Sequence, residues 1–484
     1  MKNSRSISLP TSCLTLLVLA ACGGGNSGVA DGGAGASGLG AGGMTAAGGT
    51  LATGGNAGMG GGGGQGMTPV PGTGGSVRVD ANPASDGRGP AEVMPGAPAS
   101  ANNDELFDPE RLPRFDIDLP PASLEALRLV TGSMDPRQDT YVRATFRYGN
   151  ESVADVGVRI KGEASFRPLT RKSPFKIKFD EFVPDQTFRG LKRLTLNNMV
   201  EDPSCLAERL AYHFFRAAKL PAPRCNHALV YVNGTFFGVY ANVEAEDKPF
   251  LRRWFADDGG NLYEEGQRDF VPGAETFFDL ETNQTTNDRT DLKTVITTVQ
   301  SATPATFFSE IGKSIDTTHF LRFMAAEAAV NQWDMYAYTV FYPNNFRIYH
   351  DPTSDRLVFL PWGMDMSMKP YRDSGKPHIK VFELARQADR ATARVTAGLL
   401  FQRCLTSPAC KTAFASAIAA ITGEFEAAGL EALATRYYNQ VRAHALMDTR
   451  KEHTNAEFEA GFQTLLRTIR ERPAALRADL AAAQ

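Results

Sequence analysis

Two groups of polar side chains occupy positions where turn or apolar residues would suffice. In the first group, Arg159 and Lys161 end a predicted strand at a turn, and three lysines follow within one hairpin's length: Lys172, Lys176 and Lys178. Cations held on a rigid strand suit a phosphate clamp over a nucleotide. Lysine on an exposed strand also protects a sheet edge from pairing with another chain. The residues alone leave both interpretations open.

The second group lies in the C-terminal half, at the ends of predicted elements. Asp334 directly follows an apolar helix, Asn345 precedes a predicted strand, and Asp365 ends the strand and turn LVFLPWGMD. Each alone is typical of a turn. Together they suit phosphoryl transfer, because Mg²⁺ binds one or two carboxylates plus phosphate oxygens and a base must lie near the acceptor hydroxyl. Glu208 lies on a predicted helix between the two groups, where a lone glutamate normally faces solvent.

The sequence lacks the motifs of other common kinds of catalytic and binding site. The chain has no GxSxG elbow, no HExxH and no Cys–His pairing outside presumed disulfides. The glycine runs match no phosphate loop, because no strand precedes them and no GK[ST] follows. Seven scattered histidines argue against a His-built zinc centre, and 51 basic against 54 acidic residues offer no field for nucleic acid. Composition also excludes a collagen and a multi-span membrane protein.

The segments that carry the first group are mostly strands. Period-two alternation predicts strands over 140–148, 153–161, 173–180 and 191–196. Asp202 as N-cap, a proline at the first turn and apolar residues at helical spacing predict a helix that stops before Pro221. A hairpin is expected around Asn233-Gly234. Residues 104–263 are therefore expected to form a small lobe of strands and one helix.

The segments that carry the second group are richer in helix. We expect a helix over 317–333 and strands over 338–349 and 356–361. From about residue 395 the chain is nearly all amphipathic helix, whose Ala, Leu and Phe stripes are most simply core. Residues 264–484 are thus expected to form a helix-rich lobe, and the fold class is α+β.

The N-terminus has the features of an export signal. Lys2 and Arg5 precede the apolar run LTLLVLAA, which is far shorter than the ~20 residues that span a bilayer. The run ends at Cys22 in LAAC, which resembles the bacterial lipobox and implies loss of residues 1–21 and acylation of Cys22, so that lipid anchors the protein in the cell envelope. Ordinary signal cleavage is the alternative. Gly23, where a retention aspartate would stand, favours the outer membrane and an extracytoplasmic domain.

Residues 22–103 are expected to be a disordered, glycine-rich tether. Residues 23–103 hold 28 of the 46 glycines and no aromatic residue, so they cannot bury a core. In the oxidising compartment that export implies, the four cysteines of the remaining chain predict disulfides. The loop CLTSPAC suggests the pair Cys404–Cys410, which leaves Cys205–Cys225 as the second pair.

Several long segments resemble the spore-coat CotH kinase family. They are RIKGEASFRPLTRKSPFKIKFD, LKRLTLNN, DPSCLAERLAYHFFRAAKLPAP, YVNGTFFGVYANVEAEDKPFL and NQWDMYAYTVFYPNNFRIYHDPTSDRLVFLPWGMD, in this order over about residues 106–370. The resemblance implies an atypical two-lobed, protein-kinase-like fold with a strand-rich N-lobe and a helix-rich C-lobe. It further implies binding of ATP with Mg²⁺ (or Mn²⁺) and phosphorylation of serine in secreted or surface proteins.

The resemblance also implies nucleotide-binding residues in the N-lobe. Residues that match the family's R-x-[KR]-G-x-x-S turn and the lysine strand after it are Arg159, Lys161, Gly162, Ser165, Lys172, Lys176 and Lys178. Which of the last three lysines binds the nucleotide stays open. Glu208 resembles the helix glutamate that pairs with that lysine, and Glu244 falls where a hinge contact to the nucleotide is expected.

In the C-lobe, Asp334 matches the catalytic-loop aspartate that orients the acceptor hydroxyl, and Asn345 and Asp365 match the metal-side positions. The chain departs from the family's W-D-x-D, because Gly363 in WGMD replaces one of two acids. An exported kinase acting on Ser or Thr is the first hypothesis. The second is a membrane-tethered binding or adhesion module on a degenerate kinase scaffold, and the third is another ATP-using transferase that transfers the nucleotide.

Overall fold

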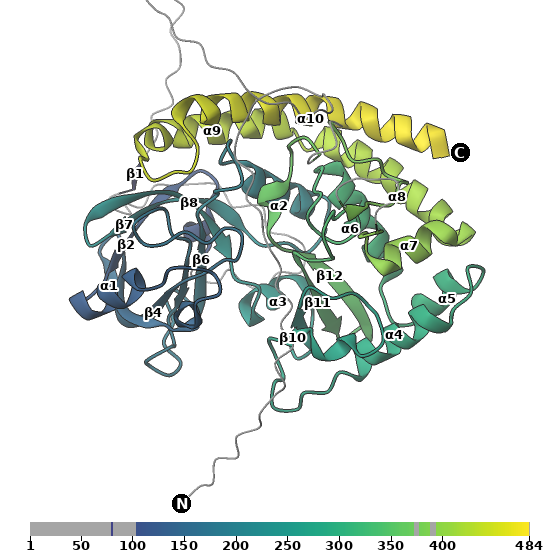
Figure 1. Ribbon diagram of the computed structural model, residues 1–484, viewed down its shortest axis with the longest axis horizontal. Coiled ribbons are helices and arrows are strands. Elements are labelled where there is room, and N and C mark those ends of the chain that lie inside the picture. Colours follow the sequence, from purple (N-terminus) through teal and green to yellow (C-terminus); the bar gives the residue numbers. More distant parts are fainter. Residues whose placement is uncertain (1–78, 81–102, 372–376, 388–393, 484) are drawn as a thin grey trace, which may run out of the picture. The chain divides into compact units, whose positions relative to one another are not determined.

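The structure, a computed structural model, describes residues 79–80, 103–371, 377–387 and 394–483. The expected signal peptide, Cys22 and almost all of the expected tether lie outside these residues. In the described part, strands dominate the first half and helices the second, as expected for an α+β chain (Figure 1).

The strand-rich lobe is built on a sheet that closes on itself. Its main strands are β2 (Leu112–Asp118), β3 (Val142–Tyr148), β4 (Glu151–Ile160), β5 (Phe175–Lys178), β6 (Arg193–Asn197), β7 (Cys225–Val232) and β8 (Thr235–Glu244). Strands β2 to β6 pair antiparallel in succession, β8 lies between β6 and β7, and β7 returns to pair in parallel with β2. Alternate side chains, among them Phe115, Phe146, Phe175 and Ile177, fill the interior.

Three short elements flank this sheet. The strand β1 (Val79–Asp80) pairs in parallel with β2. The helix α1 (Pro121–Arg128) packs Leu127 against the interior of the closed sheet, and a 3-10 turn, η2 (Pro136–Asp139), follows it.

The helix α2 (Ala207–Ala217) begins later than expected, and its N-cap is Leu206 where Asp202 was expected. The Asp202 carboxylate accepts hydrogen bonds from Ser204 N at 2.9 Å, Ser204 Oγ at 2.6 Å and Ala207 N at 2.8 Å. It therefore fixes the turn that leads into the helix. Leu210 and Phe214 of α2 pack into the core of the helix-rich lobe, so the helix lies against both halves of the chain.

The helix-rich lobe contains a second, smaller sheet. Its strands are β10 (Asp279–Leu280), β9 (Leu262–Glu264), β11 (Phe346–Asp351) and β12 (Arg356–Pro361), in that spatial order. The expected strand over 338–349 is wrong in its first half, because residues 334–345 form a loop in which Tyr336 and Tyr338 are buried without strand alternation.

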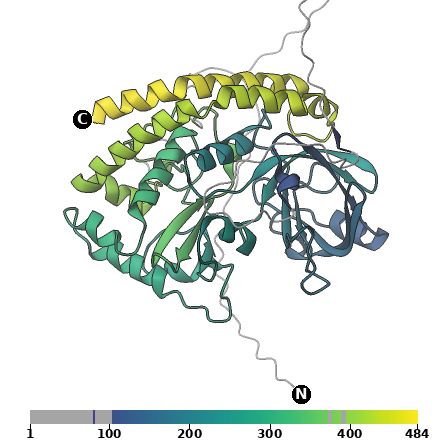
Figure 2. The same ribbon diagram turned by 180° about the vertical axis from the view of Figure 1, so that it is seen from behind.

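Helices surround the second sheet and fill the C-terminal part. They are α3 (Lys248–Trp254), α4 (Thr290–Ser301), α5 (Phe307–Ile311), α6 (Thr317–Ala329), α7 (Leu399–Thr406), α8 (Pro408–Ala427), α9 (Leu430–Met447) and α10 (Asn455–Ala483). Figures 1 and 2 show α9 and α10 running along one side of the fold, and α9 contacts β8 of the strand-rich lobe. Within the described residues no single helix has the length and apolar composition to cross a bilayer; α7 and α8 meet that test only as a pair, bent by 106°.

The cysteines differ from expectation. Cys404 and Cys410 form the expected disulfide. Cys205 and Cys225 are buried free thiols, so the expectation of a second disulfide between them is wrong. The register of β7 explains it: His227, two residues beyond Cys225, is the residue that approaches Cys205, with its Nε2 2.6 Å from the Cys205 carbonyl oxygen.

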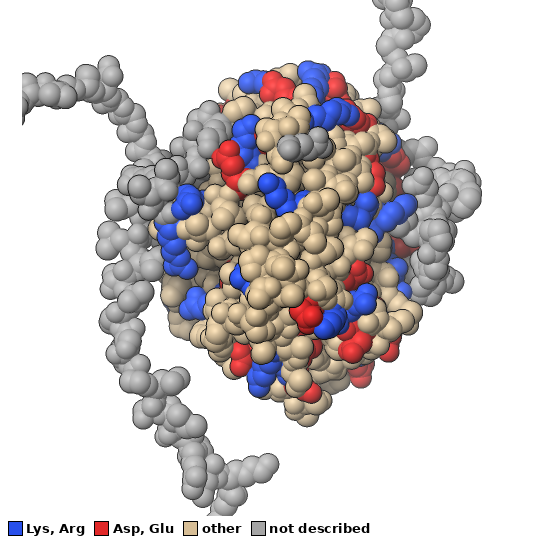
Figure 3. All heavy atoms as spheres, turned by 90° about the vertical axis from the view of Figure 1, so that its right-hand side faces the viewer, with Lys and Arg blue, Asp and Glu red and all other residues tan. Residues whose placement is uncertain are grey.

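On the face shown in Figure 3, Lys and Arg are interspersed with Asp and Glu and form no single-sign patch.

Candidate functional site

A glycine turn ends β4 and begins the site. Gly162 has a φ of +91°, and a Cβ at this position would lie 2.3 Å from Ser165 Oγ. The turn is fixed from outside by Gln138, whose Nε2 donates to the Gly162 carbonyl oxygen at 2.6 Å. The structure thus brings Ser165 next to Gly162, and only glycine fits the close approach.

The lysine that faces Glu208 is Lys161. Its Nζ donates to Asn197 Oδ1 at 2.6 Å, and Asn197 Nδ2 donates to Glu208 Oε1 at 2.7 Å. Burial lowers the pKa of Lys161, and the nearby carboxylates of Glu208 and Asp365 oppose that shift. Burial, reinforced by Asp365, raises the pKa of Glu208 to about 8. Three elements meet here, because Lys161 follows β4, Asn197 ends β6 and Glu208 lies in the first turn of α2.

Lys172 does not face the site, which corrects one expectation. Its Nζ lies 2.7 Å from Asp448 Oδ2. Asp448 belongs to residues 448–454 between α9 and α10, which we call the C-terminal strap. The partner lies far away in the sequence, so the motif around Lys172 gave no sign of this buried pair.

Of the two lysines on β5, only Lys176 remains available. Lys178 Nζ pairs with Glu181 Oε2 at 2.8 Å. Lys176 lies opposite Arg159 across the β4–β5 ladder, and within the described chain no hydrogen bond or ion pair holds its ammonium group. Burial, together with Arg347 and Arg159, lowers the pKa of Lys176 to about 8. Arg159 pairs with Asp139 and Arg347 with Glu246 and Glu264, so Lys176 is the cation here whose charge an incoming anion would balance.

Glu244 is not free to contact a nucleotide through its side chain. Its carboxylate accepts hydrogen bonds from Arg224 N at 2.9 Å and Arg224 Nη2 at 2.8 Å, and it also pairs with Arg253. Burial opposes ionisation, but Arg224 and Arg253 outweigh it and lower the pKa of Glu244. The carboxylate is thus engaged within the protein, and a contact of this position with a nucleotide stays a prediction.

Asp334 and Asn345 form one unit in the loop after α6. Asn345 Nδ2 donates to Asp334 Oδ2 at 3.0 Å and to the Asp334 carbonyl oxygen at 2.6 Å. Asn344 Nδ2 lies 3.4 Å from Asp334 Oδ1. Asn345 has a φ of +53°, and its backbone N–H donates to Glu265 Oε1 at 3.1 Å. The Asn345 amide and the conformation of the loop together fix the orientation of the Asp334 carboxylate.

A buried glutamate that the sequence did not single out positions this loop. Glu327 of α6 is fully buried, and its carboxylate accepts hydrogen bonds from Ala337 N and Tyr338 N at 2.9 to 3.0 Å. Burial raises the pKa of Glu327 to about 8. The sequence held one signal, since Glu327 is the single acid in the apolar stretch FMAAEAAV.

Asp365 lies in a 3-10 turn, η4 (Met364–Met366), that directly follows Gly363. Burial raises the pKa of Asp365 to about 6, with Glu201 and Asp202 adding to the rise and Lys369 opposing it. Lys369 Nζ donates to the Glu201 carbonyl oxygen at 2.6 Å. Nothing in the sequence marked Lys369 as a neighbour of Asp365.

Gly363 is held against Asn345. It has a φ of +56°, and a Cβ there would lie 2.2 Å from Asn345 Oδ1. Trp362 N also donates to the Asn345 carbonyl oxygen at 3.0 Å. The position where the family commonly has an acid is thus closed to a side chain in this chain.

Comparisons with known proteins relate this chain to one family. The family model described as CotH kinase protein matches residues 158–476. Inner spore coat protein H of Bacillus subtilis (strain 168) is 25% identical over 265 residues, which cover 52% of this chain and 68% of that protein. Inner spore coat protein H-like protein of the same organism is 31% identical over 78 residues, covering 16% and 24%.

Among solved structures, the crystal structure of the Helicobacter pylori proinflammatory kinase CtkA aligns with 70% of this chain and 90% of that one. The identity is 10% and the TM-score 0.28, a likeness too weak to carry an argument. The family match, by contrast, spans more than half of the chain and contains every residue of the site described above except Gln138. The chain therefore belongs to the CotH kinase family.

Proposed function

We propose that the protein is an exported, ATP- and Mg²⁺-dependent protein kinase of two-lobed, kinase-like architecture that transfers the γ-phosphate to Ser or Thr of a secreted or surface protein. One observation carries the proposal: Lys161 is hydrogen-bonded through Asn197 to Glu208, and its Nζ lies 5.9 Å from the centre of the Trp362 ring, where the nearby Asp365 carboxylate of the other lobe favours the charged lysine and so raises its pKa against burial. A lysine, a helix glutamate and a metal-side aspartate in one place are the parts that phosphoryl transfer requires.

In this proposal the cations of the strand-rich lobe bind the phosphates. Lys161 lies at the glycine turn, and Arg159 and Lys176 lie side by side on β4 and β5. A nucleotide's phosphates would add charge-assisted bonds to these cations. Their binding also opposes the effect of burial and of the neighbouring arginines, which lower the pKa of Lys176.

The residues around Asp365 fit Mg²⁺ that shares phosphate oxygens. Burial, with Glu201 and Asp202, raises the pKa of Asp365 and so disfavours its negative charge, and a divalent cation offsets that effect. Among the described residues no three acidic, histidine or cysteine side chains converge on one point, so phosphate oxygens and water must complete the shell. Asp365 and Asn345 Oδ1 are the protein groups that we assign to it. When bound, Mg²⁺ neutralises charge on the phosphates.

We assign to Asp334 the role of the base that takes the proton of the acceptor hydroxyl. As the acceptor hydroxyl oxygen forms its bond to the γ-phosphorus, the bond from that phosphorus to ADP breaks and the hydroxyl proton passes to the Asp334 carboxylate. Asn345 holds that carboxylate, and Glu327 holds the loop that carries both. Ser or Thr is the acceptor in this proposal.

Export and lipid anchoring form a separate part of the proposal. They rest on residues 1–22, which lie outside the described part of the chain. The disulfide Cys404–Cys410 agrees with an oxidising compartment. Mass spectrometry of the mature N-terminus tests it: a diacylglyceryl group on Cys22 is expected, and an unmodified N-terminus elsewhere contradicts it.

A second candidate is a tethered binding module on a degenerate kinase scaffold. The observation that favours it is Gly363, where the family commonly has an acid. Labelling of the parent chain from [γ-³²P]ATP separates the two candidates, since a binding module takes up no label. Asp365→Ala then tests the metal site, because one acid in a 3-10 turn contributes little to the core and the variant should fold. Loss of metal-dependent labelling from [γ-³²P]ATP supports the kinase, whereas equal labelling removes Asp365 from the metal site. Label from [α-³²P]ATP instead would indicate nucleotide transfer.

A further inference from the structure

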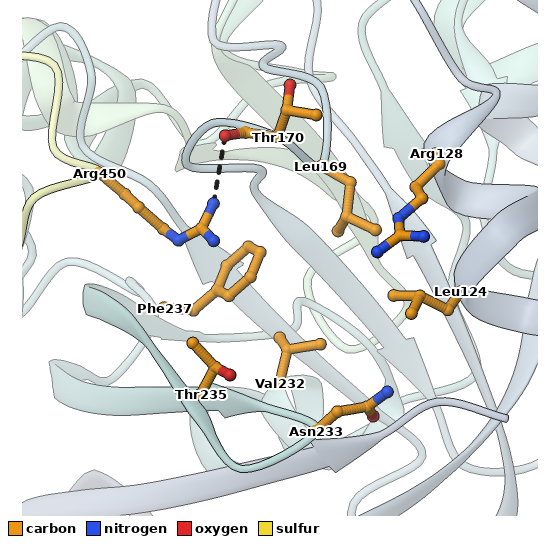
Figure 4. A pocket seen from close by; sticks show the side chains of 9 residues that line it. All are labelled: Leu124, Arg128, Leu169, Thr170, Val232, Asn233, Thr235, Phe237 and Arg450. Atoms are coloured by element: carbon orange, nitrogen blue, oxygen red, sulfur yellow. Dashed lines mark hydrogen bonds between the residues drawn. The ribbon is translucent and has the colours of Figure 1, made fainter. Parts of the chain in front are cut away.

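A pocket at one end of the closed sheet has no part in the proposed reaction. It has a volume of about 400 Å³ and lies where α1, the loop before β5, the β7–β8 hairpin and the C-terminal strap come together (Figure 4). Its lining residues from these four segments include Leu124, Leu169, Val232, Phe237 and Arg450. Mouths of closed sheets are common places for ligand sites.

The pocket combines an apolar floor with two guanidinium groups. Leu124, Leu169, Val232 and Phe237 provide the floor, and in Figure 4 Arg450 and Arg128 reach toward it from opposite sides. Among the residues that the structure describes, no acidic side chain lines the pocket. Such a surface complements a ligand that is both apolar and anionic.

The two arginines are held differently. Arg450 Nη1 donates to the carbonyl oxygens of Thr170 and Arg171, each at 3.2 Å, and its guanidinium carbon lies 4.1 Å from the centre of the Phe237 ring. This side of the pocket is therefore preformed. Arg128 is exposed and makes only a loose pair with Glu125 at 3.6 Å, so it can turn toward a ligand at little cost.

The depth of the pocket limits what enters. The interior of the closed sheet is already filled by side chains such as Phe115, Phe146 and Phe175. A long alkyl chain cannot insert lengthwise, but one aromatic or branched aliphatic side chain fits the volume. A short apolar side chain flanked by carboxylates is a polypeptide feature rather than a feature of a fatty acid.

We propose that this pocket binds an acidic polypeptide segment of a partner, with one apolar side chain on the floor and flanking carboxylates on Arg128 and Arg450. The site is separate from the kinase proposal and does not depend on it. It gives the strand-rich lobe a docking surface of its own.

A labelled peptide tests the proposal on the full chain. Fluorescence anisotropy with fluorescein-EDFDE should show saturable binding, whereas EDGDE, which lacks the apolar side chain, and KKFKK, which reverses the charges, should bind at least about tenfold more weakly. Equal binding of EDGDE would reduce the site to charge alone and overturn the proposal. Stronger binding of dodecanoate than of EDFDE, by displacement, would overturn the choice of a polypeptide.

Two variants locate the binding. Arg128→Glu removes the charge complement, and Thr235→Trp fills the pocket without changing charge; each should weaken EDFDE binding at least about tenfold. Both positions are exposed, so the fold is expected to survive. Arg143→Glu, an exposed arginine on β3 outside the pocket, is the matched control and should bind the peptide as the parent does. Unchanged binding in both pocket variants contradicts the proposal.

Discussion

Lys172 Nζ lies 2.7 Å from Asp448 Oδ2, and the two side chains are only 1% and 2% exposed. Asp448 Oδ2 also accepts a hydrogen bond from Val239 N at 3.2 Å. Gly238 permits this approach, because a Cβ there would lie 2.3 Å from the same oxygen. The C-terminal strap is therefore fastened to the closed sheet by one buried charge pair, with Glu452 adding bonds to Arg167 and Arg171 at its rim.

Lys172→Met leaves the Asp448 carboxylate buried without its partner. We expect the free energy of unfolding to fall by about 3–5 kcal/mol, because one member of a buried pair is far costlier alone than together. Urea denaturation measures the change. Adding Asp448→Asn should recover part of the loss, and Lys178→Met, which breaks an intermediate-exposure pair, should cost under about 1 kcal/mol. Equal losses for Lys172→Met and Lys178→Met would contradict this assignment.

Lys161→Met should remove nucleotide binding while the fold persists. The ammonium group is the cation at the glycine turn, and its loss leaves Asn197 still bonded to Glu208. We expect ATP affinity, measured by calorimetry, to fall at least about tenfold. Lys178→Met is the matched control on the neighbouring strand and should bind ATP normally. If the control loses as much affinity as Lys161→Met, the nucleotide lysine is misassigned.

Gly363→Asp should fail to improve activity, although it restores the acid common in the family. The new Cβ would lie 2.2 Å from Asn345 Oδ1, and Asn345 cannot move without releasing Asp334. We expect lower phosphoryl transfer and a loss of about 1–2 kcal/mol in stability. Labelling rates and thermal unfolding measure both. A variant that labels faster than the parent would show that Gly363 is a defect rather than part of the packing.

The pH dependence of stability tests the environment of Glu208. Its pKa is raised to about 8 in the fold, so between pH 5 and 8 the folded chain holds a proton that the unfolded chain releases. Stability is then greatest at low pH and falls as pH rises toward 8, by up to about 1.4 kcal/mol per unit for one group. Glu246, Glu265 and Glu327 also have pKa values raised to about 8, so Glu208→Gln should reduce this slope by one group's share in denaturation curves at pH 6, 7 and 8. An identical slope in the variant would mean that Glu208 ionises normally.

Local patterns predicted the elements that local residues determine. The alternation in 173–180 and the Asn233-Gly234 turn gave β5 and the β7–β8 hairpin. Acids placed after apolar elements pointed to Asp334 and Asp365, which the fold brings to one region with Asn345 and Lys161.

What the sequence did not reveal depends on partners remote in the chain. Lys172 and Lys176 look equivalent in the motif, and only the strap, far away in sequence, separates them. The motif around Glu244 likewise gave no sign that Arg224 and Arg253 hold its carboxylate. The Cys205–Cys225 pairing failed because strand register, which spacing does not fix, sets His227 against Cys205.

The most direct test of the kinase assignment is incorporation of label from [γ-³²P]ATP by the chain from Asn103 onward, with Mg²⁺ or Mn²⁺, into itself and a serine-rich protein. Asp334→Asn is the control, because it keeps the size of the side chain and removes the base. The account predicts metal-dependent label in the parent and a loss of at least about a hundredfold in Asp334→Asn. Equal label in both, or no label and no nucleotide-induced thermal shift in the parent, would contradict it.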